Sequence, residues 1–410
     1  MVSYLKYRRD KGADNSGITV IGFELGKDSD MESGRSLRVM HVIARMNVGG
    51  PAVLVADLMR SVDSVKFEQV LITGYCDENE SDYLDEVATD IQAVRIVGLG
   101  RSVSVIKDLL AFTGLIREIK RFNPDVIHTH TAKAGVLGRI AGLIARPSAQ
   151  RVHTYHGHLL HGYFGAGKTR VVILIEKILS WISHGLISIG TNVMKDLLKV
   201  GIGRPDKFHV IFPGLQDLDV IPKAQARKEL GLHPAKLYVV FVGRLTQIKR
   251  PDRLVEIATE LKKDLPNAHL LVAGAGELFN VTKSEAESQE LPMTFYGWRN
   301  DIARILCASD IAVLCSDNEG IPLTLIQAAQ AGLPIVSTDV GSVSDIVKHG
   351  ISGTLAGRSS AELAQGLKVL IQDLSLRDSY GLAGKTRANK YFSSQSMVAA
   401  HEQLYRDLLK

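Results

Sequence analysis

Two basic side chains stand just after an apolar run in the second half of the chain. The stretch FVGRLTQIKR (241–250) places Gly243 and Arg244 at the end of the run LYVVFV, and Lys249 follows in the same loop. Side chains after a strand lie at the carboxyl edge of a sheet, where two cationic heads can converge on one anion. An arginine can fork onto two phosphate oxygens, and a lysine supplies a movable point charge. The pattern predicts a phosphate site, although the same residues would also suit a solvated loop.

A second segment supplies a carboxylate next to a predicted helix start. In SDNEGIPLTLIQAAQAGLPIVSTDVG (316–341), Glu319 precedes Gly320, and we expect a helix to begin near Ile321–Pro322. The free N–H groups at a helix start form a seat for anions. A carboxylate beside that seat would repel a bare phosphate ligand, but it can accept hydrogen bonds from sugar hydroxyls. Phosphate seat, sugar acceptor and two cations together suggest a nucleotide diphosphate-sugar.

A rival phosphate site is suggested by GYFGAGKT (162–169), which fits the P-loop pattern G-x-x-x-x-G-K-T. In a P-loop a buried strand runs into the first glycine, and a helix starts at the lysine, here Lys168. A helical pattern does begin near Lys168, but the preceding strand pattern ends near Tyr155, and HGHLLH (156–161) makes a poor strand. We therefore expect a surface loop that leads into a helix. An ATPase or kinase that binds ATP through Lys168 is the competing hypothesis.

Histidines are concentrated in the first half and raise the question of a metal site. They are His128, His130, His153, His156, His158 and His161. Pairs that are two residues apart at strand ends, without cysteine or carboxylate at ligand spacing, are not typical of a zinc site. The three cysteines are scattered and form neither a disulfide framework nor a C-x-x-C pair. We expect no bound metal and inert thiols.

Short β-branched runs and amphipathic patterns, which must position these residues, alternate from residue 37 onward. The runs predicted as strands in the first half are LRVMHVI (37–43), QVLIT (69–73), AVRIV (93–97), DVIHTH (125–130), QRVHTY (150–155), GLISI (185–189) and FHVIF (208–212). Those in the second half are KLYVVFVG (236–243), AHLLVAG (268–274), MTFYG (293–297), DIAVLCS (310–316) and LPIVST (333–338). This alternation implies parallel sheets covered on both faces, so we predict an α/β chain of two Rossmann-like domains. Their ligands bind beyond the carboxyl ends of the strands, and the cleft between the domains is the expected site.

The domain boundaries follow from changes in composition along the 410 residues. The polar stretch 216–236 interrupts the strand rhythm and indicates a linker. The predicted parts are a polar N-terminal tail (1–36), a first Rossmann-like domain (37–218), a second (219–392) and a C-terminal helix (393–410). Two domains are also what a chain of this length favours.

Composition excludes several classes of protein. Apolar residues make up 45% of the chain, enough for buried cores, and the net charge of +5 without basic runs does not suggest nucleic-acid binding. The first residues have no apolar signal sequence, and no run of uncharged apolar residues reaches the length of a membrane span. We expect a cytoplasmic protein, with translation starting at Met1 or Met31.

These segments resemble glycosyltransferase family 4, whose members are retaining enzymes of the GT-B fold. The resemblance covers nearly the whole chain from about residue 37. It rests on GRLTQIK (243–249), on the segment 316–341, and on MNVGGPA, PDVIHTHTAKAG and HTYHGH in the first half. It implies an acceptor domain followed by a donor domain. The implied activity is transfer of a sugar from a nucleotide diphosphate-sugar to an acceptor hydroxyl, without cofactor or metal, in polysaccharide or glycoconjugate biosynthesis.

The resemblance also implies roles for individual residues. It assigns the donor diphosphate to Arg244 and Lys249, and the transferred sugar to Glu319. It implies that His156 points at the donor sugar and helps to organise catalysis, with His130 as a further pocket candidate. The remaining donor-binding positions that it implies are Gly49, Gly50, Gly243, Gly320, Ile321, Pro322, Leu323 and Gln327.

One of these positions departs from the family, which usually has a second glutamate eight residues after the first. This chain has Gln327 there. An amide can exchange hydrogen bonds with the ribose hydroxyls, but without a charged acceptor. A non-catalytic nucleotide-sugar binder is therefore one alternative, and a nucleotide-sugar 2-epimerase of the same architecture is another.

The acceptor side is predicted from the segment HGHLLHGYFGAGKTR (156–170) and from the basic stretch 107–122. Together with the apolar helix that follows residue 168, they could meet the inner face of a membrane and a lipid-linked sugar acceptor. The alternative is that these helices only pack on the sheet.

Overall fold

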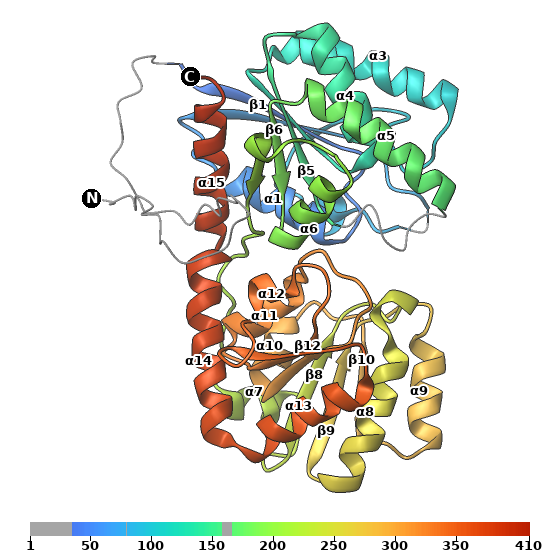
Figure 1. The fold of residues 1–410 in the computed structure, drawn as a ribbon, viewed down its shortest axis with the longest axis vertical. Coiled ribbons are helices and arrows are strands. Elements are labelled where there is room, and N and C mark those ends of the chain that lie inside the picture. Colours follow the sequence, from blue (N-terminus) through green and yellow to red (C-terminus); the bar gives the residue numbers. More distant parts are fainter. Residues whose placement is uncertain (1–34, 79, 158–165) are drawn as a thin grey trace, which may run out of the picture. The chain divides into compact units, whose positions relative to one another are not determined.

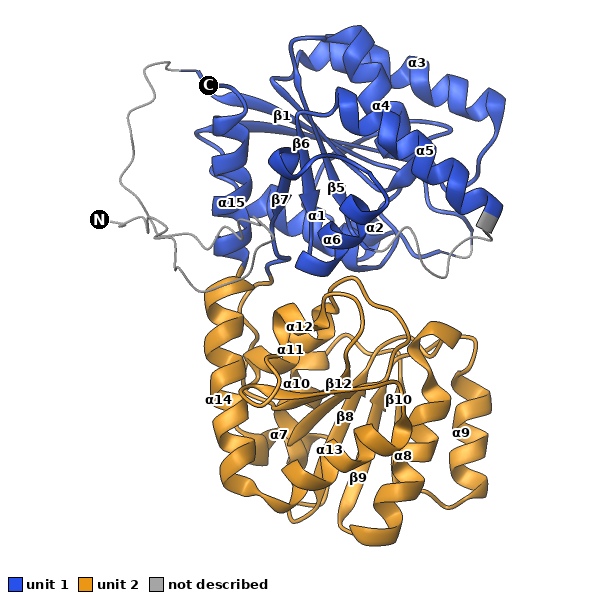
Figure 2. Cartoon of the chain, in the orientation of Figure 1, with its two compact units in different colours: residues 1–214, 394–410 blue, residues 215–393 orange. Residues whose placement is uncertain are grey.

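The structure of this chain is a computed structural model that describes residues 35–78, 80–157 and 166–410. It divides into two compact units (Figure 2). The first unit runs to Gly214 and also contains Ser394–Lys410, whereas the second comprises Leu215–Ser393. The C-terminal helix therefore belongs to the first unit. The predicted polar tail, 1–36, lies almost entirely outside the described residues.

The first unit has a parallel sheet whose seven described strands follow the order β3-β2-β1-β4-β5-β6-β7. The strands are β1 (Leu37–Ile43), β2 (Phe67–Thr73), β3 (Ala93–Arg95), β4 (Val126–His130), β5 (Gln150–Tyr155), β6 (Gly185–Ser188) and β7 (Phe208–Val210). The two central strands β1 and β4 are nearly continuous buried runs, as expected of parallel strands covered on both faces.

Helices cover this sheet (Figure 1). They are α1 (Gly50–Ser61), α2 (Tyr83–Glu86), α3 (Val105–Phe122), α4 (Ala132–Ala145), α5 (Ala166–Ile182), α6 (Thr191–Lys199), the 3-10 turn η1 (Pro205–Lys207) and α15 (Ser394–Asp407). Pro51 stands in the first turn of α1, where its missing N–H costs nothing. The C-terminal helix α15 packs against α1.

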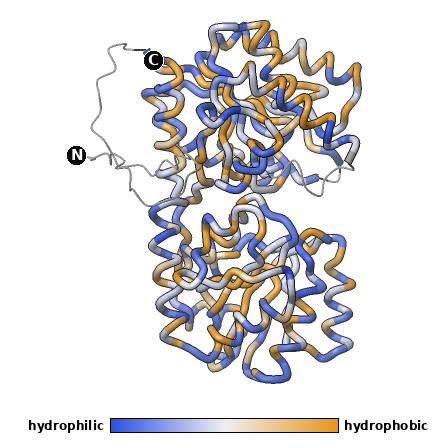
Figure 3. The backbone as a smooth tube through the Cα atoms, in the orientation of Figure 1, coloured by the Kyte–Doolittle hydropathy of each residue, from blue (hydrophilic) through white to orange (hydrophobic). Residues whose placement is uncertain are grey.

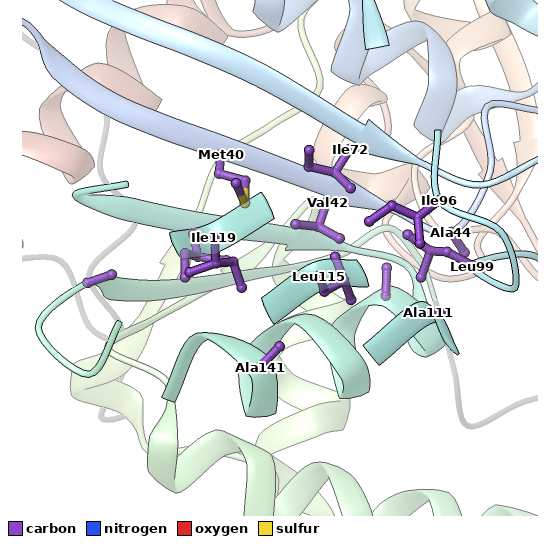
Figure 4. Close-up of a cluster of buried hydrophobic side chains, with 13 residues drawn as sticks. Met40, Val42, Ala44, Ile72, Ile96, Leu99, Ala111, Leu115, Ile119 and Ala141 are labelled. Atoms are coloured by element: carbon purple, nitrogen blue, oxygen red, sulfur yellow. The ribbon is translucent and has the colours of Figure 1, made fainter. Parts of the chain in front are cut away.

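The core of the first unit follows from the alternation of side chains along β1. Met40 and Val42 point to one face, where they pack with Ile72 of β2 and with Leu115 and Ile119 of α3 (Figure 4). The intervening side chains of β1 point to the other face, which α1 covers. This second face carries His41, a buried polar residue in the centre of the sheet.

The second unit is built on a parallel sheet of six described strands in the order β10-β9-β8-β11-β12-β13. They are β8 (Leu237–Val242), β9 (Ala268–Ala273), β10 (Met293–Gly297), β11 (Ile311–Leu314), β12 (Ile335–Thr338) and β13 (Gly353–Ala356). The helical elements are α7 (Lys223–Glu229), η2 (Gln247–Lys249), α8 (Pro251–Asp264), α9 (Phe279–Ser288), α10 (Ile302–Ala308), α11 (Leu323–Gln330), α12 (Val343–Ile346), α13 (Ser360–Gln372) and α14 (Leu374–Tyr391). In Figure 3 the strands of both units are largely hydrophobic, whereas the outer helix α9 is mostly hydrophilic.

Both sheets confirm the prediction of two Rossmann-like parallel-sheet domains. In each, the strand order reverses beside the first strand of the set, between β1 and β4 and between β8 and β11. The loops that leave the two strands at such a point diverge to opposite faces and open a crevice for ligands. Among the described residues, no helix is long and apolar enough to cross a membrane.

Candidate active site

The loop after β8 carries the predicted phosphate-binding cations. It is held at Leu245, a buried residue whose N–H donates to the Ala275 carbonyl and whose carbonyl accepts from the Leu278 N–H, both at 3.0 Å. Arg244 precedes this anchor and is exposed, and Lys249 ends the short turn η2 after it. The two cations thus stand on either side of one fixed point.

Two glycines that we did not single out from the sequence allow this anchoring. A Cβ at Gly274 would lie 1.9 Å from the Gly243 carbonyl oxygen, and one at Gly276 would lie 2.4 Å from that of Leu245. Both glycines also have positive φ angles, 140° and 157°. The signal that could have found them is the run AGAGE (273–277), which begins at the last residue of β9.

The loops after the neighbouring strands β8 and β11 are joined by hydrogen bonds and ion pairs. The Asp317 N–H donates to the Ile248 carbonyl at 2.8 Å, and the Asp317 carboxylate pairs with Arg253 at 2.8 Å and with Arg250 at 3.1 Å. The buried Cys315 thiol donates to the carbonyls of Lys249 and Arg250, both at 3.3 Å. Burial raises the pKa of this thiol to about 12, so it stays a neutral donor. The expectation of an inert thiol agrees with this environment.

This arrangement brings Lys249 and Glu319 together. The Lys249 ammonium lies 2.5 Å from Oε1 of Glu319, and the two side chains are 21% and 9% exposed. The lysine therefore engages a carboxylate in the free protein. Arg244, by contrast, has no ion-pair partner within the described residues.

The helix α11 begins at Leu323, with Pro322 as its N-cap residue, close to the predicted start. The Leu325 N–H donates to the Pro322 carbonyl at 3.0 Å, whereas the N–H groups of Leu323 and Thr324 come before the first intrahelical hydrogen bond. Gly320 is held just before the helix, because its carbonyl accepts from the Ser342 N–H at 3.0 Å. Gln327 follows one turn into α11, half-buried, and its side chain has no hydrogen-bond partner among the described residues. Gly243, Glu319 and the α11 start thus share one end of the second unit's sheet.

In the first unit, the predicted glycine loop follows β1. Gly50 is the first residue of α1 and Gly49 is its N-cap residue. Gly49 has an extended backbone that any residue can adopt, and a Cβ there would meet only the Asn47 carbonyl oxygen, at 3.8 Å. The fold itself therefore does not require a glycine at this position.

The histidines gather near the carboxyl ends of β4 and β5. Nδ1 of His130 lies 3.0 Å from Nε2 of His156, and Nε2 of His130 lies 3.3 Å from Nδ1 of His41. Burial lowers the pKa of His41 and of His156 to about 3, and it lowers that of His130 well below its usual value, with neighbouring histidines adding to the effect. His130 and His156 also line a small cavity with Thr154, His401 and apolar side chains.

The zinc hypothesis can be examined on the same cluster. His41, His128 and His130 are buried, and one nitrogen of each ring lies within 4.8 Å of one nitrogen of each of the other two. However, His128 donates to or accepts from Tyr405 and Thr154, at 2.7 Å on each nitrogen, and both nitrogens of His41 and His130 are also in hydrogen bonds. An ion here would have to displace these bonds. Sequence reasoning missed His41 and Tyr405, because neither lies near the other histidines in the chain.

The P-loop pattern is only partly described. β5 ends at Tyr155, well before the first glycine of the pattern, and α5 begins at Ala166, before rather than at the exposed Lys168. Residues 158–165, which include most of the predicted acceptor-side loop with His158 and His161, lie outside the described residues.

Comparisons with known proteins match both halves of the chain. The family described as "Glycosyltransferase Family 4" matches residues 48–217, and "Glycosyl transferases group 1" matches residues 222–387. A relative from Escherichia coli, named UDP-Gal:alpha-D-GlcNAc-diphosphoundecaprenol alpha-1,3-galactosyltransferase, is 32% identical over 70% of this chain and 76% of its own length. A putative glycosyltransferase EpsD from Bacillus subtilis is 26% identical over 71% of this chain and 79% of its own length.

Solved structures agree on the fold. Anabaena Alr3699/HepE, crystallised in complex with UDP, has a TM-score of 0.77 at 18% identity, with 90% of this chain and 100% of that chain covered. Sucrose-phosphate synthase from Thermosynechococcus elongatus has a TM-score of 0.76 at 20% identity, covering 92% and 99%. Because the two family models match both halves of the sequence and the two parallel sheets agree with the solved structures, this chain belongs to glycosyltransferase family 4 and is a glycosyltransferase of the GT-B fold.

Proposed function

We propose that this glycosyltransferase is a retaining, metal-independent enzyme that moves a sugar from a UDP-sugar to a hydroxyl of a lipid-linked sugar. The E. coli relative is named for such a transfer, and Anabaena Alr3699/HepE was crystallised with UDP, with UDP and glucose, and with UDP-glucose. The relatives compared above are named as transferases or synthases, which favours transfer over 2-epimerisation or mere binding.

The observation that carries the proposal is the contact of Lys249 with Glu319, which shortly precedes the start of α11. Arg244 belongs to the same loop after β8 as Lys249. The reaction breaks the bond between the sugar's anomeric carbon and the diphosphate, and it forms a bond from that carbon to the acceptor oxygen. As the bond to the sugar breaks, its electron pair stays on the diphosphate, so negative charge builds on the departing UDP, which then takes up the acceptor proton. Two cations and the N–H groups of a helix start would stabilise this charge, which is the work of a divalent ion in other transferases.

In this proposal Glu319 and His156 bind the transferred sugar. Glu319 accepts hydrogen bonds from sugar hydroxyls, and Lys249 shifts from Glu319 toward the diphosphate when the donor binds. His156 contacts the transferred sugar and Gln327 contacts the ribose. Gly49 allows a ligand to approach the backbone closely, which gives a reason for a glycine that the backbone conformation does not require.

A peripheral membrane contact would suit a lipid-linked acceptor. Two helices of the first unit expose apolar side chains beside basic ones. On α3 these are Val105, Ile106 and Leu109, and on α5 they are Val171, Leu174, Ile178 and Trp181, all more than half exposed. Apolar faces flanked by lysine and arginine are typical of helices that lie on anionic membranes. We expect sedimentation with anionic vesicles, weakened by Trp181→Ser; equal sedimentation of both proteins would remove this face from the proposal.

The central experiment measures donor turnover with a panel of UDP-, GDP- and ADP-sugars, with and without EDTA. Lys249→Ala should reduce transfer about a hundredfold, as expected for one preplaced charge at the leaving group. Lys168→Ala, the matched lysine of the P-loop pattern, should change transfer little. Tight ATP binding that is lost in Lys168→Ala would instead support the P-loop hypothesis, and an isomerised sugar without acceptor would support epimerisation.

Two further outcomes test the finer parts of the proposal. Activity that is abolished by EDTA and restored by Mg²⁺ or Mn²⁺ would contradict metal independence. His156→Ala should lower kcat more than it raises KM, because a group that organises the reacting sugar matters most as the bond breaks. An unchanged kcat would exclude His156 from the site.

A further inference from the structure

Three histidines and a glutamine form a continuous line of hydrogen bonds across the first sheet. Nε2 of His156 meets Nδ1 of His130 at 3.0 Å, Nε2 of His130 meets Nδ1 of His41 at 3.3 Å, and Nε2 of His41 meets Oε1 of Gln69 at 3.2 Å. Gln69, His41 and His130 lie in the neighbouring strands β2, β1 and β4, and His156 directly follows the next strand, β5. We call this line the Gln69–His156 chain.

The direction of the chain is set at the Gln69 end. The Gln69 amide nitrogen donates to the Met59 carbonyl at 3.1 Å, and a carbonyl can only accept. The amide oxygen must therefore face His41. Because that oxygen is an acceptor, the proton of the neutral His41 ring must be on Nε2, and its Nδ1 carries a lone pair.

The position of the proton in His41 also determines the proton positions in the rings of His130 and His156. Burial lowers the pKa of all three histidines, so each ring is neutral at pH 7 and has one proton. The His41 Nδ1 lone pair requires a proton on Nε2 of His130, and the Nδ1 lone pair of His130 then requires a proton on Nε2 of His156. Nδ1 of His156 is left as a bare acceptor.

The neighbouring histidines that the structure describes do not interfere with this order. His128 is occupied by Tyr405 and Thr154, and Nδ1 of His401 is bonded to the Met397 carbonyl at 2.8 Å. The bare Nδ1 of His156 is buried and has no hydrogen-bond partner among the described residues. A buried acceptor without a partner is unfavourable, so a ligand that supplies a donor there would gain a hydrogen bond.

We propose that Gln69, acting through His41 and His130, holds His156 as the Nε2–H tautomer so that its Nδ1 accepts a hydrogen bond from a hydroxyl of the transferred sugar. Gln69, His41 and His130 are positioning residues in this proposal, and only His156 contacts the ligand. The hydrogen bond from a sugar hydroxyl to His156 rests on the proposed function. The tautomer itself does not.

The tautomer is tested on the full-length protein without ligand. Histidines are labelled with ¹⁵N, and two-bond ¹H–¹⁵N spectra distinguish protonated from bare ring nitrogens; the His156 signals are those lost in His156→Gln. We expect a bare Nδ1 and a protonated Nε2. A proton on Nδ1 of His156 would overturn the proposal.

Two substitutions at one position separate orientation from packing. Gln69→Leu removes the acceptor, so the proton of His41 is no longer held on Nε2. The Nδ1–H form of His156 should then become populated. Gln69→Glu keeps an acceptor oxygen at His41. A neighbouring carboxylate raises a histidine pKa by about 1–3 units, which takes the pKa of His41 from about 3 to a value still below 8. The His41 ring therefore stays neutral at pH 8, and Gln69→Glu should preserve the wild-type tautomer. Val70→Ala on the same strand controls for lost stability alone, and its tautomer should be that of wild type.

Turnover of a UDP-sugar completes the test. Gln69→Leu should lower kcat about three- to tenfold, the effect of one neutral hydrogen bond, and Gln69→Glu should restore most of it. A shifted tautomer with an unchanged kcat would refute the contact with the sugar, and an unchanged tautomer in Gln69→Leu would refute the role of Gln69. A wild-type protein that has the expected tautomer but no transfer with any donor would instead refute the proposed function.

Discussion

Glu319→Gln should tighten the binding of UDP while it slows sugar transfer. In the free protein the Lys249 ammonium is 2.5 Å from the Glu319 carboxylate, so a diphosphate must compete for the lysine. Glutamine keeps the size of the side chain but removes its charge. The substitution therefore releases Lys249 and also removes an anion that repels the phosphates.

The expected size of the effect follows from charge separation. A carboxylate about 6 Å from a phosphate charge, at an effective dielectric constant of about 40, repels it by about 1.4 kcal/mol, which is tenfold in affinity. The release of Lys249 adds to this gain in affinity. The gain is reduced in part, because the glutamine oxygen can still accept a hydrogen bond from Lys249. We expect UDP to bind about tenfold more tightly to Glu319→Gln. Transfer should fall at least tenfold, since a neutral amide accepts more weakly from the sugar hydroxyls.

The control is a double-mutant cycle with Lys249→Met. In that background the gain from Glu319→Gln should shrink, because no lysine remains to be released. Lys249→Met alone should lower the free energy of unfolding by about 2 kcal/mol, since it leaves a 9% exposed carboxylate without its partner. Adding Glu319→Gln should restore most of that loss.

The assay is calorimetric titration with UDP in a buffer without divalent ions, combined with urea unfolding of the four proteins. Weaker UDP binding to Glu319→Gln would show that Glu319 does not repel the diphosphate. A gain of equal size in both backgrounds would show that Lys249 is not the cation that the donor recruits.

Three further predictions concern other parts of the chain. Gln327→Glu should tighten UDP binding by a few-fold to tenfold through charged bonds to the ribose, with little change in kcat; calorimetry with equal affinities would place this residue away from the ribose. Glu176→Ala should lower the unfolding free energy by about 3–5 kcal/mol, because it leaves the fully buried Arg139 guanidinium, 2.8 Å from both carboxylate oxygens, without its counter-charge; a urea midpoint unchanged from wild type would contradict this. The folded-state pKa values of about 3 for His41 and about 4 for His401 lie below the unfolded value of about 6.5, so the unfolded chain takes up protons first as the pH falls. Unfolding free energy should therefore decrease by about 1.4 kcal/mol per histidine and pH unit between about pH 6 and 4, and a His401→Gln variant with an undiminished slope in urea unfolding would refute the assignment.

Much of the fold could be predicted from local pattern. Every run predicted as a strand overlaps a strand of the structure, because strands buried on both faces of a parallel sheet are continuous apolar runs. The short strand β13 was missed, since GTLA is flanked by glycine and has no such run. The order of segments along the chain also placed Arg244, Lys249 and Glu319 after strands, where a parallel sheet gathers its ligands.

The partners of these residues could not be predicted in the same way. The contact of Lys249 with Glu319 joins loops from two strands that become neighbours only when the sheet adopts its reversed order. The C-terminal helix was expected as a separate element, but it returns to the first unit, where Tyr405 bonds His128.

The sequence by itself determined the types of element, their order and the chemistry of the side chains at their ends, because these depend on local propensity and periodicity. Tertiary structure alone decided which side chain meets which. Gln69 and His156 lie far apart in the chain and show no shared pattern, yet strand order and register join them through two buried rings. A hydrogen-bond direction that starts at one strand and ends at another is a property of the assembled sheet, and no single segment contains it.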